Sequence, residues 1–329
     1  MYRRVRGALG LVREATIIPY AGYQHPDGIE VRGRVLEEQP DWSPLEADTR
    51  LRNVRGIGRL FHTHELPGEP VTLHGWSGDA TTVFADDEGY IDALLPAAPT
   101  VETTRWDGLR ATLKNGAEAS LPILRVGSSA RFGILSDIDD TVMQTGAENL
   151  FRNLWTTFTG NSLSRMVYRN VPALFNGLVR HEGVITNPLF YLSSSPWNLY
   201  GLIRDVLERN AVPWGPIFLR DFGIDRGKFI NNTHGEHKVG NACRLLQQFD
   251  GLPFLLVGDL GQADAEVYLE VVRRRPGQVL GVIIHQPSDR AHTEKRRQLA
   301  AIEEAGVTTL LTRDYAEAIT LGRQKGWID

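Results

Sequence analysis

Two aspartates, Asp137 and Asp139, follow the apolar run 132–136 and have a spacing that suggests chemistry. Side chains two apart on a strand share a side, so both carboxylates approach one point if the extended backbone continues past Ser136. Carboxylates held close together repel each other unless a cation lies between them, and Mg²⁺ prefers such oxygen ligands. Acidic pairs are also common in ordinary loops, so this motif alone leaves a structural role open.

A second apolar run, 189–193, ends in three serines and a proline. Ser193, at the tip of the predicted strand, could donate its hydroxyl to a phosphoryl oxygen, and nearby backbone N–H groups would add affinity for an anion. Ser195 and Pro196 have the pattern of a helix N-cap followed by proline at the first helical position. Serine is so frequent in such loops that this signal is weak without other residues.

A further carboxylate, Asp259, follows Gly258 and the apolar run 254–257. Burying such a charge is costly unless it is paired or bound to a metal, and Gly258 permits a close backbone approach. Asp264 begins a predicted helix, so a capping role competes with a role in a site. Lys238 lies near another predicted helix start, and taken alone it would be interpreted as a solvated lysine. A site with several carboxylates and a phosphate dianion, however, needs one cation to offset their charge.

The elements that must position these residues alternate, from residue 132 onward, between short apolar runs and stretches of helical periodicity. This alternation predicts an α/β domain over residues 129–329, built on an open, parallel, Rossmann-like sheet. Such sheets bind ligands at the carboxyl ends of their strands, which is where the acidic and serine motifs fall. The predicted strands are 132–136, 189–193, 216–219, 254–257, 279–285 and 308–311.

Two regions lie outside this alternation. Residues 143–188 are rich in Leu, Phe, Tyr and Trp and predict two or more helices, either a helical cap inserted about 143–188 or an ordinary crossover with extra helices. Residues 1–128 show runs of period two between turn signals. They predict a small β-sandwich domain of about seven strands, whose role the sequence leaves unknown.

The composition limits the classes of partner. A chain of 329 residues with a net charge of −4 gives no indication of nucleic-acid binding. Since no apolar run approaches the roughly 18–20 residues that a membrane span needs, we expect a cytoplasmic protein without a transmembrane segment, with peripheral attachment to a membrane as an option. The basic runs 273–275 and 295–297 are typical of solvated helix faces, although a phospholipid surface would attract them.

Taken together, these motifs resemble the four signature motifs of the haloacid dehalogenase-like phosphatase superfamily. They resemble its branch of actin-patch-type phosphatidate phosphatases more closely, over roughly residues 130–325, and the β-rich first part is similar to the companion region of bacterial members. Two positions depart from the pattern: Ser194 stands where an Asn is common, and 285–287 carries less charge than expected. The matching segments are 137–141, 193–197 with 199–200, 219–223, 237–238 and 258–268.

The resemblance implies a mechanism. It makes Asp137 the nucleophile that forms an aspartyl-phosphate and Asp139 the general acid and base. It implies Mg²⁺ as the cofactor, held by Asp137, by the backbone carbonyl of Asp139 and by Asp259. Ser193 and Lys238 would hold the phosphoryl oxygens.

The same resemblance gives supporting and peripheral roles. Asp264 would orient Asp259, Lys238 or a metal-bound water, and Asp140 is expected to be a loop carboxylate rather than a catalyst. Arg220 and Asp221, after the third predicted strand, could contact substrate or simply brace the loop as an ion pair. The expected supporting residues are Thr141, Ser194, Gly258 and Asp264.

The function implied is a phosphatase acting on phosphatidate or a related lipid phosphate. One alternative is the same chemistry on a soluble phosphate ester or nucleotide. Another, from a different class, is a non-catalytic interaction protein with a vestigial phosphatase domain. The intact set of Asp137, Asp139, Ser193, Lys238 and Asp259 favours an enzyme.

Overall fold

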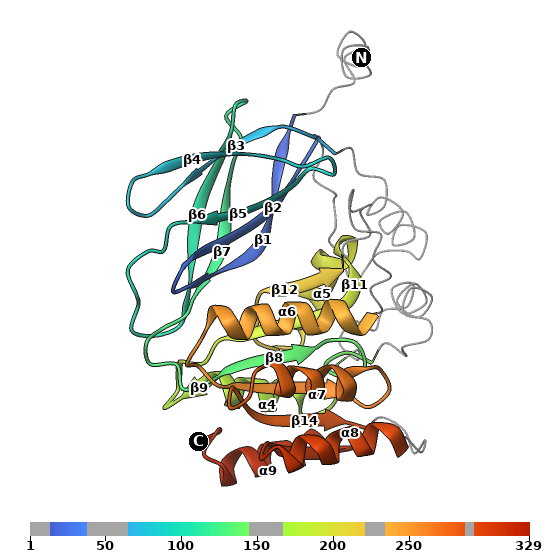
Figure 1. Cartoon of the computed structure of the whole chain (residues 1–329). Helices are drawn as coiled ribbons and strands as arrows, with labels where there is room; N and C mark the ends of the chain where they lie inside the picture. The colour runs from blue at the N-terminus through green and yellow to red at the C-terminus, as the bar shows by residue number, and fades with distance from the viewer. Residues whose placement is uncertain (1–13, 38–64, 145–166, 221–233, 287–292) are drawn as a thin grey trace. The chain divides into compact units, whose positions relative to one another are not determined.

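The computed structural model describes residues 14–37, 65–144, 167–220, 234–286 and 293–329 (Figure 1). The chain divides into two compact units. The first comprises Met1–Pro99 and Trp106–Arg125, and the second comprises Thr100–Arg105 and Val126–Asp329. Each unit is described by itself below.

The first unit is a curled β-sheet. Its described strands form a single hydrogen-bonded sheet of seven in the order β4-β3-β6-β7-β1-β2-β5, with β1 and β7 parallel. The two ends of this order, β4 and β5, contact each other, so the sheet curls around its own apolar core, where the sequence led us to expect two facing sheets. The strands are β1 (Thr16–His25), β2 (Gly28–Leu36), β3 (Pro70–His74), β4 (Ala80–Phe84), β5 (Tyr90–Leu95), β6 (Arg105–Leu113) and β7 (Glu118–Arg125).

Local sequence explains the sharp reversal between β4 and β5. Gly89 has a φ of +82°, a conformation that glycine adopts without steric cost. The carboxylate of Asp86 accepts hydrogen bonds from the backbone N–H groups of Glu88 and Tyr90, at 2.9 and 2.8 Å. An aspartate at this place therefore stabilises the turn between the two strands.

The second unit contains a six-stranded sheet whose strands all pair in parallel, in the order β12-β11-β8-β13-β14-β15. Each of the six predicted apolar runs coincides with one of these strands. A separate two-stranded hairpin, β9 (Arg180–His181) and β10 (Val184–Ile185), lies outside this sheet. The six strands are β8 (Gly133–Asp137), β11 (Leu189–Pro196), β12 (Ile217–Arg220), β13 (Phe254–Asp259), β14 (Val279–His285) and β15 (Thr308–Thr312).

Helices cover both faces of this sheet. The chain steps from β8 to β11 to β12 in one direction and then crosses back to β13, β14 and β15, so right-handed crossovers place the two sets of helices on opposite faces. In one layer α7 contacts both α6 and α8, as Figure 1 shows, while α4 contacts α9. The helices are α4 (Val171–Val179), the short 3₁₀ helix η3 (Trp197–Leu199), α5 (Tyr200–Arg209), α6 (His234–Gln248), α7 (Asp264–Arg274), α8 (Thr293–Glu304) and α9 (Tyr315–Gln324).

Helix α4 is the described helix of the predicted insertion, and it is part of the sheet's helical cover. Its apolar face, including Val171, Leu174 and Phe175, is buried. Asn170 at its start donates a hydrogen bond to Asp314 at the start of α9, at 2.7 Å. This helix is therefore one part of the connection between β8 and β11. Residues 145–166 lie outside the described residues, so a cap stays a prediction.

The strand order determines where a ligand could bind. Strands β8 and β13 are neighbours, yet the chain leaves β8 toward β11 on the other side, so the order reverses between them. A crevice forms at such a switch point because the connections diverge to opposite faces. Asp137 and Asp259 are the last residues of these two strands.

Candidate active site

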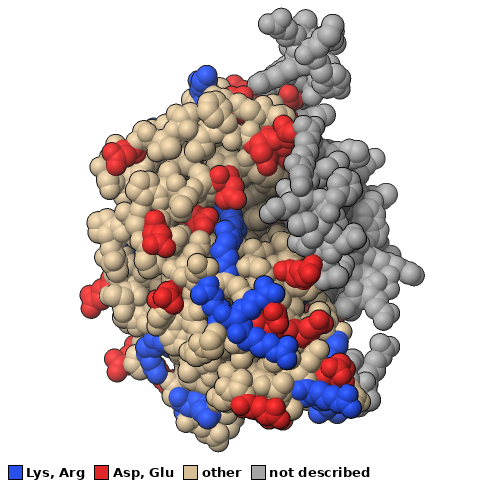
Figure 2. Space-filling view, in the orientation of Figure 1, with Lys and Arg blue, Asp and Glu red and all other residues tan. Residues whose placement is uncertain are grey.

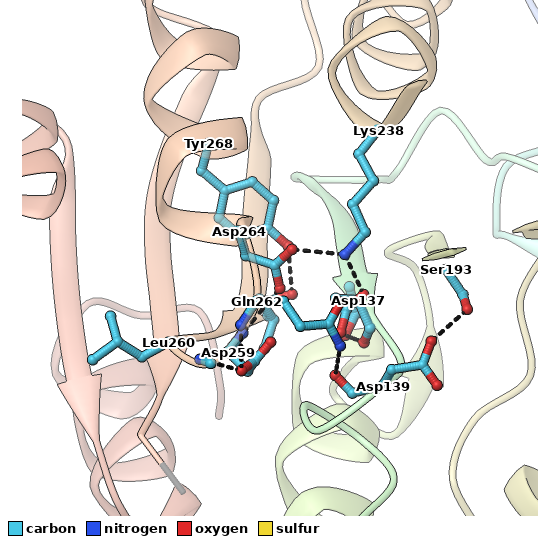
Figure 3. Close-up of polar contacts among 12 residues, drawn as sticks. Asp137, Asp139, Ser193, Lys238, Asp259, Leu260, Gln262, Asp264 and Tyr268 are labelled. Carbon is cyan, nitrogen blue, oxygen red and sulfur yellow. Dashed lines mark hydrogen bonds and ion pairs between the residues drawn. The ribbon is translucent and has the colours of Figure 1, made fainter. Parts of the chain in front are cut away.

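Asp137 and Lys238 form the centre of the site (Figure 3). The lysine Nζ lies 2.7 Å from Oδ1 of Asp137 and 2.7 Å from Oδ1 of Asp264. All three side chains are buried, with exposed fractions of 5% or less. Lys238 lies near the start of α6, the helix that precedes β13 in the chain. Its side chain extends toward Asp137 at the end of β8.

Asp259 is held by the loop that follows it. Its Oδ2 accepts hydrogen bonds from the backbone N–H groups of Gly261 and Gln262, the latter at 3.1 Å. A β-carbon at Gly261 would lie 2.7 Å from Oδ2 of Asp259, so a larger residue there would displace this carboxylate. The loop therefore holds Oδ2 of Asp259 in place and makes no hydrogen bond to Oδ1.

Asp264 links the helix α7 to the strand tip. Its Oδ2 accepts a hydrogen bond from the backbone N–H of Asp259 at 3.0 Å, and its Oδ1 accepts from Lys238. The N-cap of α7 is Ala263, so Asp264 does not cap the helix and is instead its first residue. The absence of a side chain at Gly258 makes this approach possible, because a β-carbon there would lie 2.7 Å from Oδ2 of Asp264.

Two carboxylate oxygens of this cluster have buried positions and no hydrogen-bond partner among the described residues. They are Oδ2 of Asp137 and Oδ1 of Asp259. Asp137, Asp259 and Asp264 each offer an oxygen within 4.8 Å of the others. Buried, unpartnered carboxylate oxygens at this separation fit a hard divalent cation. Asp139 contributes no carboxylate to the cluster.

The side chain of Asp139 points instead to β11. Its Oδ2 accepts hydrogen bonds from the hydroxyls of Ser193 and Ser195, at 2.7 and 3.2 Å. Ser195 is therefore not the helix N-cap that its sequence suggested: β11 continues to Pro196, which is the N-cap of η3. The extended backbone keeps both serines, two residues apart, on the side of the strand that faces Asp139.

The electrostatic environment raises the pKa of three carboxyl groups. Burial is the main cause for Asp137, whose pKa lies well above its usual value, and the charge of Asp264 adds to it. Burial also raises the pKa of Asp139, against the hydrogen bond from Ser193. For Asp259, burial and the charge of Asp264 raise the pKa to about 7.

Lys238 keeps its charge in spite of its surroundings. Burial lowers its pKa, but the charges of Asp137 and Asp264 and their hydrogen bonds more than offset this effect, so the net pKa is raised. One ammonium thus lies among several carboxyl groups, which is the balance that the sequence motifs required.

The remaining residues predicted for the site differ in burial and in the element that carries them. Thr141 is fully buried, and its backbone carbonyl accepts a hydrogen bond from the hydroxyl of Tyr315 at 2.8 Å. Asp140 has a φ of +59° in the turn after β8, which agrees with a loop carboxylate. Ser194 is half-buried. Arg220 ends β12, and Asp221 lies outside the described residues.

Sequence reasoning missed two contributors to the site. Gln262 donates its side-chain amide to the backbone carbonyl of Asp139 at 2.9 Å. Tyr268 donates its buried hydroxyl to the carbonyl of Val257 at 2.7 Å, which ties α7 to β13. The position of Gln262 within the Gly-Asp motif loop was a usable signal, whereas a tyrosine on a helical face reads only as core.

One family model matches the part of the chain that holds this site. Residues 132–286 match the family model described as "Phosphatidate phosphatase APP1, catalytic domain". The matched segment begins just before β8 and ends just after β14, so it contains every residue of the cluster.

Two relatives align over a longer part of the chain. "Phosphatidate phosphatase APP1" of Saccharomyces cerevisiae is 26% identical over 250 residues, which is 73% of this chain and 41% of that protein. An uncharacterized protein of Schizosaccharomyces pombe is 24% identical over 214 residues, or 61% of this chain and 34% of that protein. This chain therefore spans less than half the length of either relative.

The similarity of this chain to solved structures is too weak to indicate a fold or a function. A glycosyl hydrolase family 2 member from Bacteroides cellulosilyticus is 9% identical, covers 91% of this chain and 44% of its own, and has a TM-score of only 0.27. Among the described helices, none is long and apolar enough to cross a membrane.

Proposed function

We propose that this chain is a Mg²⁺-dependent phosphomonoesterase that works through an aspartyl-phosphate on Asp137. The observation that carries the proposal is one cluster at the strand ends: a buried carboxylate with an unpartnered oxygen, a lysine beside it, and a second carboxyl group of raised pKa two residues away. A nucleophile, a cation for the phosphoryl charge and a proton donor are the three groups that such a reaction needs.

In the first step, a carboxylate oxygen of Asp137 forms a bond to phosphorus while the bond from phosphorus to the ester oxygen breaks. Asp139, in its protonated form, gives its proton to the leaving alkoxide. Burial raises the pKa of Asp139, which favours the protonated form that this step uses. The alcohol departs and the phosphoryl group stays on Asp137.

In the second step, Asp139 takes a proton from water as the water oxygen attacks phosphorus. The bond between phosphorus and Asp137 breaks, inorganic phosphate leaves, and Asp139 is protonated again. Splitting one displacement into two lowers each barrier.

Lys238 and Ser193 would hold the phosphoryl oxygens. Lysine has three N–H donors and Lys238 uses two of them on Asp137 and Asp264, so one remains for substrate. Ser193 has a single hydroxyl proton, which it donates to Asp139, so a contact with phosphate requires that proton to turn.

Asp137 and Asp259 would hold Mg²⁺ through the two oxygens that lack partners. The backbone carbonyl of Asp139 is the third protein ligand we expect, since a carbonyl has two lone pairs and Gln262 uses one of them. The bound cation would offset the repulsion between the carboxylates and neutralise phosphoryl charge.

Phosphatidate, or a related lipid phosphate, is the substrate class we propose. The support is the family that residues 132–286 match and the name of the yeast relative. A basic surface does not add to it: Arg273 and Arg274 both lie within ion-pair distance of Glu270, and Figure 2 shows acidic side chains among the basic ones on the face it presents. We place the protein in the cytoplasm, with peripheral access to a membrane surface.

The test is Mg²⁺-dependent phosphate release from dioleoyl phosphatidate micelles, a short-chain soluble analogue and p-nitrophenyl phosphate. Asp137→Asn removes the nucleophile and should lower kcat by roughly 10³-fold or more, because residues that act as one catalytic unit fail together. Asp250→Asn makes the same chemical change at an exposed position and should keep wild-type activity.

The outcomes separate the three readings. Micelle activity that requires Mg²⁺ and Asp137 supports a lipid phosphatase. Activity confined to the soluble esters keeps the mechanism and rejects the lipid substrate. No activity on any of them in wild-type protein would favour a non-catalytic interaction protein or another substrate.

A further inference from the structure

Lys295, on helix α8, makes contacts that its sequence context did not suggest. It belongs to the basic run 295–297, which reads as a solvated helix face, and its neighbours Arg296 and Arg297 are exposed. The ammonium of Lys295, however, lies 2.7, 2.7 and 2.6 Å from the backbone carbonyl oxygens of Leu260, Gly261 and Gln262. All three of its N–H donors are thus directed at three successive carbonyls of one loop.

These carbonyls belong to the loop that holds Asp259. The peptide that carries the Leu260 carbonyl also carries the N–H of Gly261, and the peptide with the Gly261 carbonyl carries the N–H of Gln262. Both N–H groups donate to Oδ2 of Asp259. Lys295 and Asp259 therefore bind opposite ends of the same two peptide dipoles, and hydrogen bonds in such a chain strengthen one another.

The loop also reaches the other side of the site. The side chain of Gln262 donates to the backbone carbonyl of Asp139, as Figure 3 shows, while the backbone carbonyl of Gln262 accepts from Lys295. One residue of α8 thus fixes a loop that contacts both Asp259 and Asp139. The two unpartnered carboxylate oxygens lie in the cluster that this loop bounds.

We infer that Lys295 is a positioning residue for the divalent cation: it sets the loop 260–262 so that Asp259 presents its unpartnered oxygen to the metal. The inference rests on the proposed Mg²⁺ site. Lys295 touches neither substrate nor metal and acts through two peptide groups, as outer groups do when they orient a metal ligand. A lysine that merely anchors α8 would stabilise the fold without changing affinity for Mg²⁺.

The experiment measures Mg²⁺ binding without substrate, in the full chain, as the Mg²⁺ concentration at the midpoint of a titration at constant temperature, and it also records whether Mg²⁺ raises Tm. Lys295→Met removes the charge and keeps the length of the side chain. It should raise that concentration roughly 10-fold, the usual effect of losing a group that orients a metal ligand. The Mg²⁺ concentration for half-maximal phosphate release should rise by the same factor.

Two further variants make the comparison specific. Arg297→Met removes a charge from the same helix at a side chain that is 76% exposed and lies 3.5 Å from Glu294, so it should leave the Mg²⁺ midpoint unchanged. Lys295→Arg keeps the charge, but a planar guanidinium cannot direct three donors at one turn as an ammonium does, so we expect an intermediate midpoint. This variant also provides the test if Lys295→Met fails to fold.

Equal Mg²⁺ midpoints in Lys295→Met and Arg297→Met would overturn the inference. A wild-type chain whose Tm and activity both ignore Mg²⁺ would overturn the metal site and the inference with it. A shifted midpoint in a chain that releases phosphate from no substrate would support the positioning role and reject the proposed function.

Discussion

The carboxyl group of Asp139 shows how single hydroxyls set the chemistry of the site. Ser193 and Ser195 both donate to its Oδ2, and both hydrogen bonds lower its pKa against the larger effect of burial. Hydrogen bonds to a carboxylate favour its charged form, so the serines moderate a pKa that burial alone would raise further. A general acid needs this balance because it must both give and take a proton.

We therefore expect Ser195→Ala to shift the pH profile of activity. Loss of one hydrogen bond to the carboxylate should raise the pKa of Asp139, so the alkaline limb of kcat/KM, where the acid loses its proton, should move up by roughly one pH unit. The measurement is the pH–rate profile with a soluble phosphate ester. Thr320→Ala is the control, because the hydroxyl of Thr320 donates to the carbonyl of Ala316 within α9, away from the site. An unmoved alkaline limb in Ser195→Ala would argue against Asp139 as the acid.

At the scale of elements, the site depends on how closely α7 approaches β13. Gly258 lies where the two meet, and a β-carbon there would come within 2.8 Å of both Asp264 and the ring of Tyr268. The hydroxyl of Tyr268 bonds the carbonyl of Val257, so the helix is held against the strand on both sides of the glycine. This contact places Asp264 beside Asp259 and Lys238.

Gly258→Ala should consequently destabilise the second unit, because overpacking at a buried contact costs about 1–3 kcal/mol. The change in unfolding free energy can be measured by urea denaturation. Gly240→Ala is the matched control. Gly240 lies inside α6, and outside the helix's own backbone no atom of the described residues comes within 4 Å of its β-carbon position, so alanine there should stabilise by about 0.5–1 kcal/mol. If the two substitutions have the same sign, the packing argument is wrong.

At the scale of the whole molecule, the carboxyl cluster couples stability to pH and to metal. The pKa of Asp259 rises from 3.8 to about 7, and the pKa values of Asp137 and Asp139 are also raised. Such groups bind protons more tightly in the folded chain than in the unfolded chain, so the free energy of unfolding falls as pH rises through this interval. His285 has the opposite effect, because burial lowers its pKa.

The raised pKa values of the three carboxyl groups outweigh the lowered pKa of the one imidazole. We therefore expect the metal-free protein to be more stable at pH 5 than at pH 7.5, by on the order of a few kcal/mol. Mg²⁺ should reverse much of this loss and stabilise more at pH 7.5 than at pH 5, since binding to carboxylates competes with protons. Thermal unfolding in EDTA and in Mg²⁺ at the two pH values measures both effects. A metal-free chain that becomes more stable as pH rises would contradict the pKa directions given above.

Much of the site follows from local sequence. The six apolar runs of the second unit are strands because each is long enough to cross a buried sheet and is bounded by polar residues. Parallel strands align their carboxyl ends at one edge, so motifs that end three such runs must converge. Asp137, Ser193 and Asp259 could be predicted together for that reason, and Lys238 followed from the need for one cation.

What only the tertiary structure decided depends on contacts between residues far apart in the chain. Ser195 has the local pattern of an N-cap, but the carboxylate of Asp139, 56 residues away, determines that its hydroxyl points into the site. In the first unit, β1 pairs in parallel with β7, which lies far along the chain, and period-two patterns do not specify such a partner. Lys295 has the composition of a solvated helix face, and only the packing of α8 shows the three carbonyls that it binds. Periodicity and spacing encode which face of an element is buried, whereas the partner of a polar group depends on the three-dimensional arrangement that brings distant segments together.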